Sequence, residues 1–204
     1  MQRFKQRLQY LKHPINSVLD VGAYRGDFAR VIRELFPAAH IKCIEGDERQ
    51  APYLQEFDTD FYLLGQKTEQ VDFYTLPEDC CTTGSSIYRE NTVYYIDPLV
   101  VKKWIYSLDE LKFPPFDLIK LDVQGAELDI LKGGKKYLAA TKPTYLLLET
   151  SIQQYNQGAP LAGKVISYLN KKHYLLRDII DVAYDSNGQL LQVDFLFERD
   201  PSAT

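Results

Sequence analysis

Cysteine, histidine, methionine and tryptophan are all scarce in this chain of 204 residues. It has three Cys, three His, one Met and one Trp. The cysteines are Cys43, Cys80 and Cys81, and no C-x-x-C spacing among them offers a disulfide framework or a zinc knuckle. This cysteine usage favours a reducing compartment, so we predict a cytoplasmic protein.

Long apolar runs and an excess of basic residues are also missing. No run of about 18 apolar residues exists, so no integral membrane segment is predicted. The net charge is −4, with 24 basic and 28 acidic residues. The chain therefore lacks the positive surplus with which nucleic-acid-binding proteins neutralise phosphates, and nucleic acid is not an expected partner.

The N-terminal 14 residues carry basic side chains but no continuous apolar stretch, so they do not resemble a signal peptide. Phe4, Leu8 and Leu11 recur instead at helical spacing. This predicts an N-terminal helix within residues 1–14, laid on a core of residues 15–198. A basic helix on a membrane surface is the less favoured alternative.

Apolar and aromatic residues are plentiful. The chain is 45% hydrophobic and 13% aromatic, with fifteen Tyr, which excludes a disordered or collagen-like chain. A length of 204 residues fits one α/β domain with a substantial core, and we predict a single domain over residues 1–204.

After Pro14, short apolar runs alternate with helical stretches, which indicates a parallel sheet with crossover helices. Strands are expected at 17–21, 40–45, 61–64, 117–121 and 144–149, and helices at 26–35, 50–57, 126–138 and 161–171. Strand candidates at 71–76 and 100–106 surround the polar stretch 78–91, which indicates an insertion over the sheet. Apolar runs at 174–180 and 191–197 flank an Asn-Gly pair, which predicts an antiparallel hairpin at the end of the sheet.

Ligands of open α/β sheets bind beyond the carboxyl ends of the strands, where this chain has glycines and acids. The first strand runs through Asp20 into Gly22 and Gly26, and the second ends at Glu45, 23 residues after Gly22. An acid at this spacing suits hydrogen bonds to a ribose diol. Tyr24 stands where a second glycine would admit a pyrophosphate, so S-adenosylmethionine fits better than NAD. The plain alternative is a strand-to-helix turn with a solvated Glu45.

The run Lys120 to Gly134, KLDVQGAELDILKGG, is a more specific signal. It resembles the I-K-[IL]-D-V-[EQ]-G-x-E signature of the FkbM methyltransferases, which are S-adenosylmethionine-dependent O-methyltransferases. Other family motifs follow in the same order, namely D-V-G-A-x-x-G at 20–26, T-G-S-S at 83–86, S-L-D-E-L at 107–111, G-A-P-L-A-G at 158–163 and D-F-L-F at 194–197. The resemblance spans about residues 17–198. Two departures are Tyr24, where many members have Asn, and Gly46-Asp47, where many have Pro.

This resemblance implies a class I methyltransferase fold, a Rossmann-like three-layer sandwich whose mostly parallel sheet has an antiparallel last strand. It also implies O-methylation of a sugar or glycan-like hydroxyl. The residues expected to bind the cofactor are Asp20, Gly22, Ala23, Tyr24, Gly26, Glu45, Gly46, Gly65, Gln66 and Asp122.

Methyl transfer to an alcohol needs alignment of the oxygen and removal of its proton. Asp122, at the end of the fourth strand, is the expected base, with Glu127 and Glu149 as the other catalytic candidates. Helix capping by Asp122 and Glu127 is the structural alternative. Asp122, Glu149 and Glu127 also suit Mg²⁺, an alternative that we do not favour. The three histidines have no ligand spacing, so no metal site is assigned.

Two polar loops are the candidates for binding the acceptor. Ser85 and Ser86 lie in the insertion, and Gln154 and Tyr155 follow the fifth strand. Hydroxyl, amide and aromatic groups suit a sugar or polyol, although ordinary loops contain them too. Two rival functions stay open at this point, a nicotinamide-dependent oxidoreductase and a cofactor-binding module without turnover. The oligomeric state and the acceptor's identity are not encoded in any motif.

Overall fold

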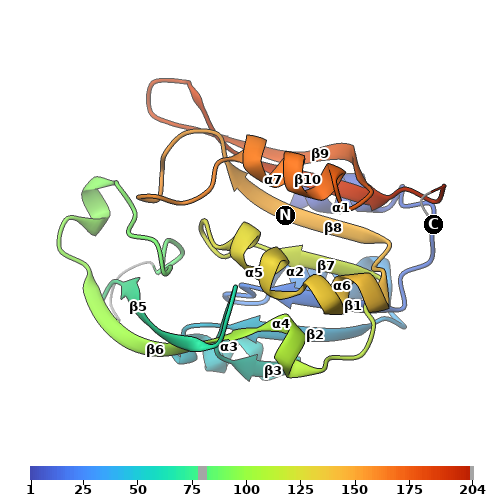
Figure 1. Cartoon of the computed structure of the whole chain (residues 1–204), viewed down its shortest axis with the longest axis horizontal. Helices are drawn as coiled ribbons and strands as arrows, with labels where there is room; N and C mark the ends of the chain where they lie inside the picture. Colours follow the sequence, from blue (N-terminus) through green and yellow to red (C-terminus); the bar gives the residue numbers. More distant parts are fainter. Residues whose placement is uncertain (78–81, 203–204) are drawn as a thin grey trace.

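The backbone forms two β-sheets with helices on both faces of the larger one (Figure 1). A computed structural model describes residues 1–77 and 82–202. Cys80, Cys81 and the first part of the predicted polar stretch 78–91 lie outside the described residues. Cys43 lies in the larger sheet and is a buried free thiol.

The larger sheet has the strand order β3-β2-β1-β7-β8-β10-β9. Its strands are β1 (Ser17–Val21), β2 (His40–Glu45), β3 (Asp58–Phe61), β7 (Leu118–Leu121), β8 (Tyr145–Ser151), β9 (Tyr174–Tyr184) and β10 (Leu190–Arg199). The pairs from β3 to β8 are parallel, whereas β10 pairs antiparallel with both β8 and β9. The predictions of a mostly parallel sheet and of an antiparallel end are confirmed.

Helices cover the larger sheet on both faces and enclose two apolar cores. The helices are α1 (Gln2–Leu8), α2 (Asp27–Leu35), α3 (Ala51–Leu54), α4 (Leu108–Leu111), α5 (Glu127–Gly133), α6 (Lys135–Thr141) and α7 (Ala162–Asn170), with short 3-10 turns η1 (Glu48–Gln50) and η2 (Val93–Tyr95). One core packs residues of α1, α2 and α3 against Val18 and Leu118. The other packs α5 and α7 against Leu19 and Leu121. Because alternate residues of a strand face opposite sides, both faces of the central strands are buried.

A second sheet of three strands stands beside the larger one, built from β4 (Leu63–Gly65), β5 (Glu69–Thr75) and β6 (Leu99–Ser107). β4 pairs parallel with β6, and β5 pairs antiparallel with it. The long β5–β6 ribbon curves away to one side of the molecule (Figure 1). The insertion predicted between the third and fourth parallel strands is thus a sheet of its own.

Four predicted elements differ from the structure. The helix expected at 50–57 is only the short α3, preceded by the 3-10 turn η1. The strand expected at 61–64 is divided, because the chain leaves the larger sheet after Phe61 and enters the second sheet at Leu63. The helix expected at 126–138 breaks at Gly134 into α5 and α6. The N-terminal helix ends at Leu8, although Leu11 still packs on the same core as Phe4.

Candidate active site

A cavity of about 310 Å³ opens beyond the carboxyl ends of the parallel strands. Ligand cavities usually lie at this edge of open α/β sheets. Its wall comes from the turn after β1, the ends of β2, β7 and β8, the β3–β4 connection and the insertion. Of the residues predicted to bind or react, the cavity is lined by Gly22, Ala23, Tyr24, Glu45, Gly46, Ser85, Ser86, Asp122 and Glu149.

Gly22 allows the turn after β1 to pass close to the end of β7. Its φ is +76°, and a Cβ atom there would lie 1.8 Å from the backbone oxygen of Asp122. Its N–H donates to the carbonyl of Ile44 at 2.9 Å. Glycine is therefore required here by the neighbouring backbone. Gly22 also lines the cavity, so its predicted contact with the cofactor stays a prediction.

Glu45 fastens the same turn to the end of β2. One carboxylate oxygen accepts the N–H of Tyr24 at 2.6 Å, and the other accepts the N–H of Asp47 at 2.8 Å. Glu45 is 9% exposed, and burial raises its pKa against the lowering effect of these backbone donors. The carboxylate thus reaches the cavity wall with a fixed orientation, because two backbone groups hold it.

Lys120 is buried between two carboxylates on β1 and just after β7. Its ammonium lies 3.3 Å from Asp20 and 3.2 Å from Asp122. These anions raise the pKa of Lys120 although burial opposes them, whereas burial raises the pKa of Asp20. Asp20 is fully buried and does not line the cavity, so its predicted cofactor contact is not supported. Asp20 instead holds Lys120 beside Asp122.

A bridge formed by the Gln124 side chain joins Asp122 to Glu149. The amide nitrogen of Gln124 donates to Asp122 at 3.0 Å and to Glu149 at 2.7 Å. Gln192, on β10, donates to the same Glu149 oxygen at 2.9 Å. Burial and the nearby carboxylates, Asp122 first among them, raise the pKa of Glu149 well above its usual range. Asp122 and Glu149 thus form an oriented pair of carboxyl groups at the cavity wall.

Asp194 extends this pair into a row of acids across the sheet. It lies opposite Glu149 in the β8–β10 register and opposite Asp181 in the β9–β10 register. Burial, with the neighbouring Asp122, raises the pKa of Asp194 to about 7. Asp194, Gln192 and Gln124 were not predicted from the sequence. Gln124 and Asp194 both stand inside recognised motifs, but only the strand register brings Asp194 and Gln192 to Glu149.

Glu127 does not face the cavity. Its carboxylate accepts the N–H groups of Val123 at 3.0 Å and Gly125 at 3.1 Å, and it is 3% exposed. Burial raises its pKa to about 7. Glu127 therefore holds the loop that follows Asp122, and its predicted role in proton transfer is not supported. This placement resembles the structural alternative of helix capping, because the carboxylate accepts backbone N–H groups just before α5.

The two loops predicted to bind the acceptor are joined to each other. Glu90 and Asn156 form an antiparallel bridge, and the N–H of Asn91 donates to the carbonyl of Tyr155 at 2.8 Å. Ser86 is buried, and its hydroxyl donates to the Gln124 carbonyl at 2.8 Å. The joined loops thus form a roof that rests on the loop after Asp122.

Several predicted residues lie away from the cavity wall. Gln154 is exposed and donates to the carbonyls of Asn156 and Ala159, and Tyr155 bonds to Glu90. Gly26 caps α2, and its backbone packs near Leu54 and Phe57. Gly65 and Gln66 lie against Gly133 of α5, because the chain has already entered the second sheet there. The nearby cavity residues are instead Tyr62, Leu63 and Leu64.

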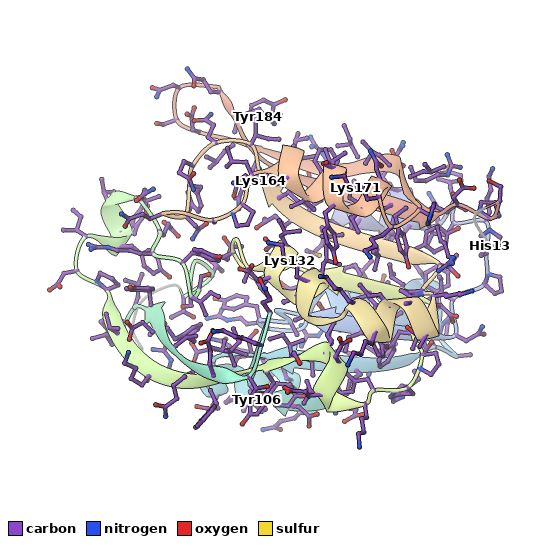
Figure 2. All side chains as sticks on the ribbon, viewed as in Figure 1. His13, Tyr106, Lys132, Lys164, Lys171 and Tyr184 are labelled. Atoms are coloured by element: carbon purple, nitrogen blue, oxygen red, sulfur yellow. The ribbon has the colours of Figure 1, made fainter. Side chains whose placement is uncertain are left out.

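Metal ligands and membrane spans are not found in residues 1–77 and 82–202. Within them, no group of three or more His, Cys, Asp and Glu is arranged to hold a metal ion. His13 lies at the opposite end of the molecule from β5 (Figure 1 and Figure 2), where it contacts Glu198 at 3.4 Å. In the same part of the chain, none of the helices has the length and apolar character needed to cross a bilayer.

Comparisons with known proteins identify the family. Residues 20–176 match the model of the methyltransferase FkbM domain, so the chain belongs to the FkbM methyltransferase family. It is 28% identical to the 2-O-methyltransferase NoeI of Sinorhizobium fredii, over 76% of this chain and 71% of that protein. The resemblance predicted from the sequence motifs is therefore confirmed.

Solved structures show the same fold. The FkbM methyltransferase of Methylobacillus flagellatus matches 94% of this chain with a TM-score of 0.61 and 15% identity. This chain spans about half, 47%, of that protein. The 1,6-didemethyltoxoflavin-N1-methyltransferase of Burkholderia thailandensis, solved with S-adenosylhomocysteine, has a TM-score of 0.52 and 13% identity over 98% of this chain and 77% of its own. Family and fold together confirm the prediction of a class I, S-adenosylmethionine-dependent methyltransferase domain.

Proposed function

We propose that this chain transfers the methyl group of S-adenosylmethionine to a hydroxyl group of a sugar or glycan-like acceptor. The observation that carries the proposal is the pair of carboxyl groups, Asp122 and Glu149, oriented by Gln124 at the wall of the cavity. The family match supports methyl transfer, and the name of the relative NoeI, a 2-O-methyltransferase, supports oxygen as the atom that is methylated.

The cavity suits the cofactor in volume and in the chemistry of its wall. Glu45 presents an acid to a ribose diol, while Ile44, Leu63 and Phe73 supply an apolar surface for adenine. Asp122 and Glu149 supply negative charge near a sulfonium. The bound cofactor supplies an electrophilic methyl group on that sulfonium. We therefore assign ribose recognition to Glu45 and the adenine wall to the apolar residues.

The carboxyl pair provides a place for the acceptor's proton. Lys120 and Gln124 each donate to Asp122 and fix the position of its carboxyl group beside Glu149. Burial and the neighbouring Asp122 raise the pKa of Glu149, which makes it a stronger base than an ordinary carboxylate. Glu149 accepts the proton of the hydroxyl, and the neighbouring Asp122 stabilises that proton on Glu149 electrostatically. This assignment moves the base from Asp122, which the sequence favoured, to its partner.

The site disfavours the oxidoreductase alternative. A dinucleotide needs free backbone N–H groups at the turn after β1 to bind its pyrophosphate. Here the Tyr24 N–H is used by Glu45, and the Gly22 and Ala23 N–H groups are used by Ile44. A pyrophosphate would therefore displace bonds that hold the turn.

The sugar-like acceptor is supported by the roof over the cavity. Thr82, Thr83, Ser85 and Ser86 line the same cavity as the carboxyl pair. Hydroxyl groups suit a polyol through mutual hydrogen bonds. The sequence also favoured Gln154 and Tyr155. Their backbone carbonyls accept hydrogen bonds from Asn91, and these bonds join the two loops of the roof.

Two measurements test the proposed function. Calorimetric titration with S-adenosylhomocysteine and with NAD separates the two enzyme classes, and only the first ligand is expected to bind. A screen of sugars with methyl-labelled S-adenosylmethionine tests turnover. Glu149→Gln should lower kcat by about 10² to 10⁴ and leave S-adenosylhomocysteine affinity within about threefold. Glu48→Gln, which changes an exposed carboxylate, is the control.

NAD binding without S-adenosylhomocysteine binding would overturn the proposal. Binding of S-adenosylhomocysteine without label transfer to any sugar would favour the module without turnover or a different acceptor. Normal kcat in Glu149→Gln would refute its role as the base, and Asp122→Asn would then be compared in the same assay.

A further inference from the structure

Arg25 stands at the cavity wall between two tyrosine rings. It follows Tyr24 in the turn after β1, and its guanidinium carbon lies 5.2 Å from the centre of the Tyr24 ring. The same carbon lies 4.6 Å from the centre of the Tyr53 ring, on α3. Two cation–π contacts from different elements hold the guanidinium plane while leaving its N–H edge open to hydrogen bonding.

The backbone around Arg25 is equally well fixed. Tyr24 and Gly26, on either side, have φ values of +49° and +80°. The carbonyl of Arg25 accepts a bond from the Arg30 side chain at 2.8 Å. The direction in which Arg25 leaves the turn is therefore set by the fold, which lowers the entropy that binding would cost.

Charge distinguishes Arg25 from the other basic side chain of the wall. Lys120 is engaged by Asp20 and Asp122, whereas no ion pair to Arg25 occurs among residues 1–77 and 82–202. Arg25 is exposed to solvent, and Asp27, two residues on, is paired with Arg30. A guanidinium held in a plane without an acidic partner is suited to binding a carboxylate or phosphate in bidentate fashion.

We propose that Arg25 binds an anionic oxygen group, a carboxylate or a phosphate, at the mouth of the cavity, with Tyr24 and Tyr53 fixing its plane. The proposal rests on the proposed function for its first candidate ligand, since the methionyl end of S-adenosylmethionine carries a carboxylate. The second candidate source is an acidic group on the acceptor. Both sources present the same chemistry to Arg25, so the experiment has to separate them.

Calorimetry with two matched ligand pairs separates the sources. The first pair is S-adenosylhomocysteine and 5′-methylthioadenosine, which lacks the amino-acid end. The second is glucuronate and glucose, titrated into protein saturated with S-adenosylhomocysteine. Each is measured with the unchanged protein, Arg25→Gln and Tyr53→Ala. Arg33→Gln is the matched control, because Arg33 also lies over an aromatic ring, Phe57, but does not line the cavity.

If the cofactor supplies the anion, Arg25→Gln weakens S-adenosylhomocysteine about tenfold or more and changes methylthioadenosine less than about twofold. Tyr53→Ala then weakens S-adenosylhomocysteine about two- to fivefold. If the acceptor supplies it, S-adenosylhomocysteine is unaffected and Arg25→Gln removes the preference for glucuronate over glucose. Arg33→Gln changes neither pair.

Two results would overturn the proposal. One is that Arg25→Gln changes neither pair; the other is that it weakens charged and uncharged members equally, which indicates a role in holding the turn. If the unchanged protein binds neither adenosyl compound, the proposed function fails. The Arg25 proposal is then judged on glucuronate and glucose titrated into the protein alone.

Discussion

Replacement of Glu127 by glutamine tests whether this buried group resists ionisation. Glu127 is 3% exposed, and burial raises its pKa from the ordinary value of about 4.5 to about 7. A raised carboxyl pKa stabilises the folded state below the unfolded pKa, and this contribution is lost as pH rises through the folded pKa. A difference of about 2.5 units corresponds to about 3 kcal/mol of unfolding free energy. The protein should therefore lose about that much stability between about pH 4.5 and pH 8 through Glu127.

In Glu127→Gln, the new amide side chain retains an oxygen for the N–H groups of Val123 and Gly125, but it has no proton to lose in this range. Any fixed cost of the added amide hydrogens is the same at every pH. Urea unfolding of both proteins at pH 5, 6, 7 and 8 isolates the Glu127 contribution. Relative to the unchanged protein, Glu127→Gln should gain about 2.5 kcal/mol between pH 5 and pH 8, roughly 1 M in urea midpoint. Parallel stability curves for the two proteins would refute the reasoning, and Glu48→Gln serves as the exposed control.

Three further substitutions test the turn and the roof. Gly22→Ala should cost about 3 kcal/mol or more, because the new Cβ would meet the Asp122 carbonyl at 1.8 Å and φ is +76°; a fall in Tm of roughly 6–12 °C or more checks it, and an unchanged Tm contradicts it. Glu45→Ala leaves two backbone N–H groups without their acceptor and should weaken S-adenosylhomocysteine about tenfold or more by calorimetry, whereas unchanged affinity would remove Glu45 from the site. Ser86→Ala removes the hydrogen bond to the Gln124 carbonyl and should lower the free energy of unfolding by about 1–2 kcal/mol in urea. An unchanged free energy of unfolding would indicate that the hydroxyl faces only the cavity.

The parts of the fold with strong local patterns could be predicted from the sequence. The bounds of β1 and β2 were predicted correctly, because each is a short segment with several Val, Leu, Ile or Cys residues that is bounded by turns. The apolar run at 61–64 was assigned to one strand, since periodicity does not show where a chain changes sheets. The break at Gly134 was also missed. The need for small residues there comes from α5, where a Cβ on Gly133 would lie 2.1 Å from the Gly65 carbonyl.

The part of the candidate site that lies at the ends of the parallel strands was predicted, and the part that depends on strand register was not. Glu45 ends β2, Asp122 directly follows β7, and Glu149 lies near the end of β8. Because parallel strands end at one edge of the sheet, topology brings these side chains together. Asp194 and Gln192 come from an antiparallel strand, and their place beside Glu149 depends on the β8–β10 register. No local motif specifies that register.

Glu127 shows a different limit of sequence reasoning. Its position in the motif predicted proximity to Asp122, which directly follows β7, while Glu127 is the first residue of α5. The motif did not indicate direction, and the carboxylate turns back to the loop N–H groups instead of the cavity. The sequence therefore shows that an acid is present near Asp122, whereas backbone geometry decides whether its carboxylate faces the cavity or the loop.

The most direct test of the account is the fate of a ¹³C-labelled methyl group from S-adenosylmethionine, followed by NMR with the sugar that responds best in the screen. We predict a new methyl ether signal on the sugar, formed faster as pH rises through the titration of Glu149 and slowed about 10² to 10⁴-fold in Glu149→Gln. Label on nitrogen or carbon, or an undiminished rate in Glu149→Gln at every pH, would contradict the central claim.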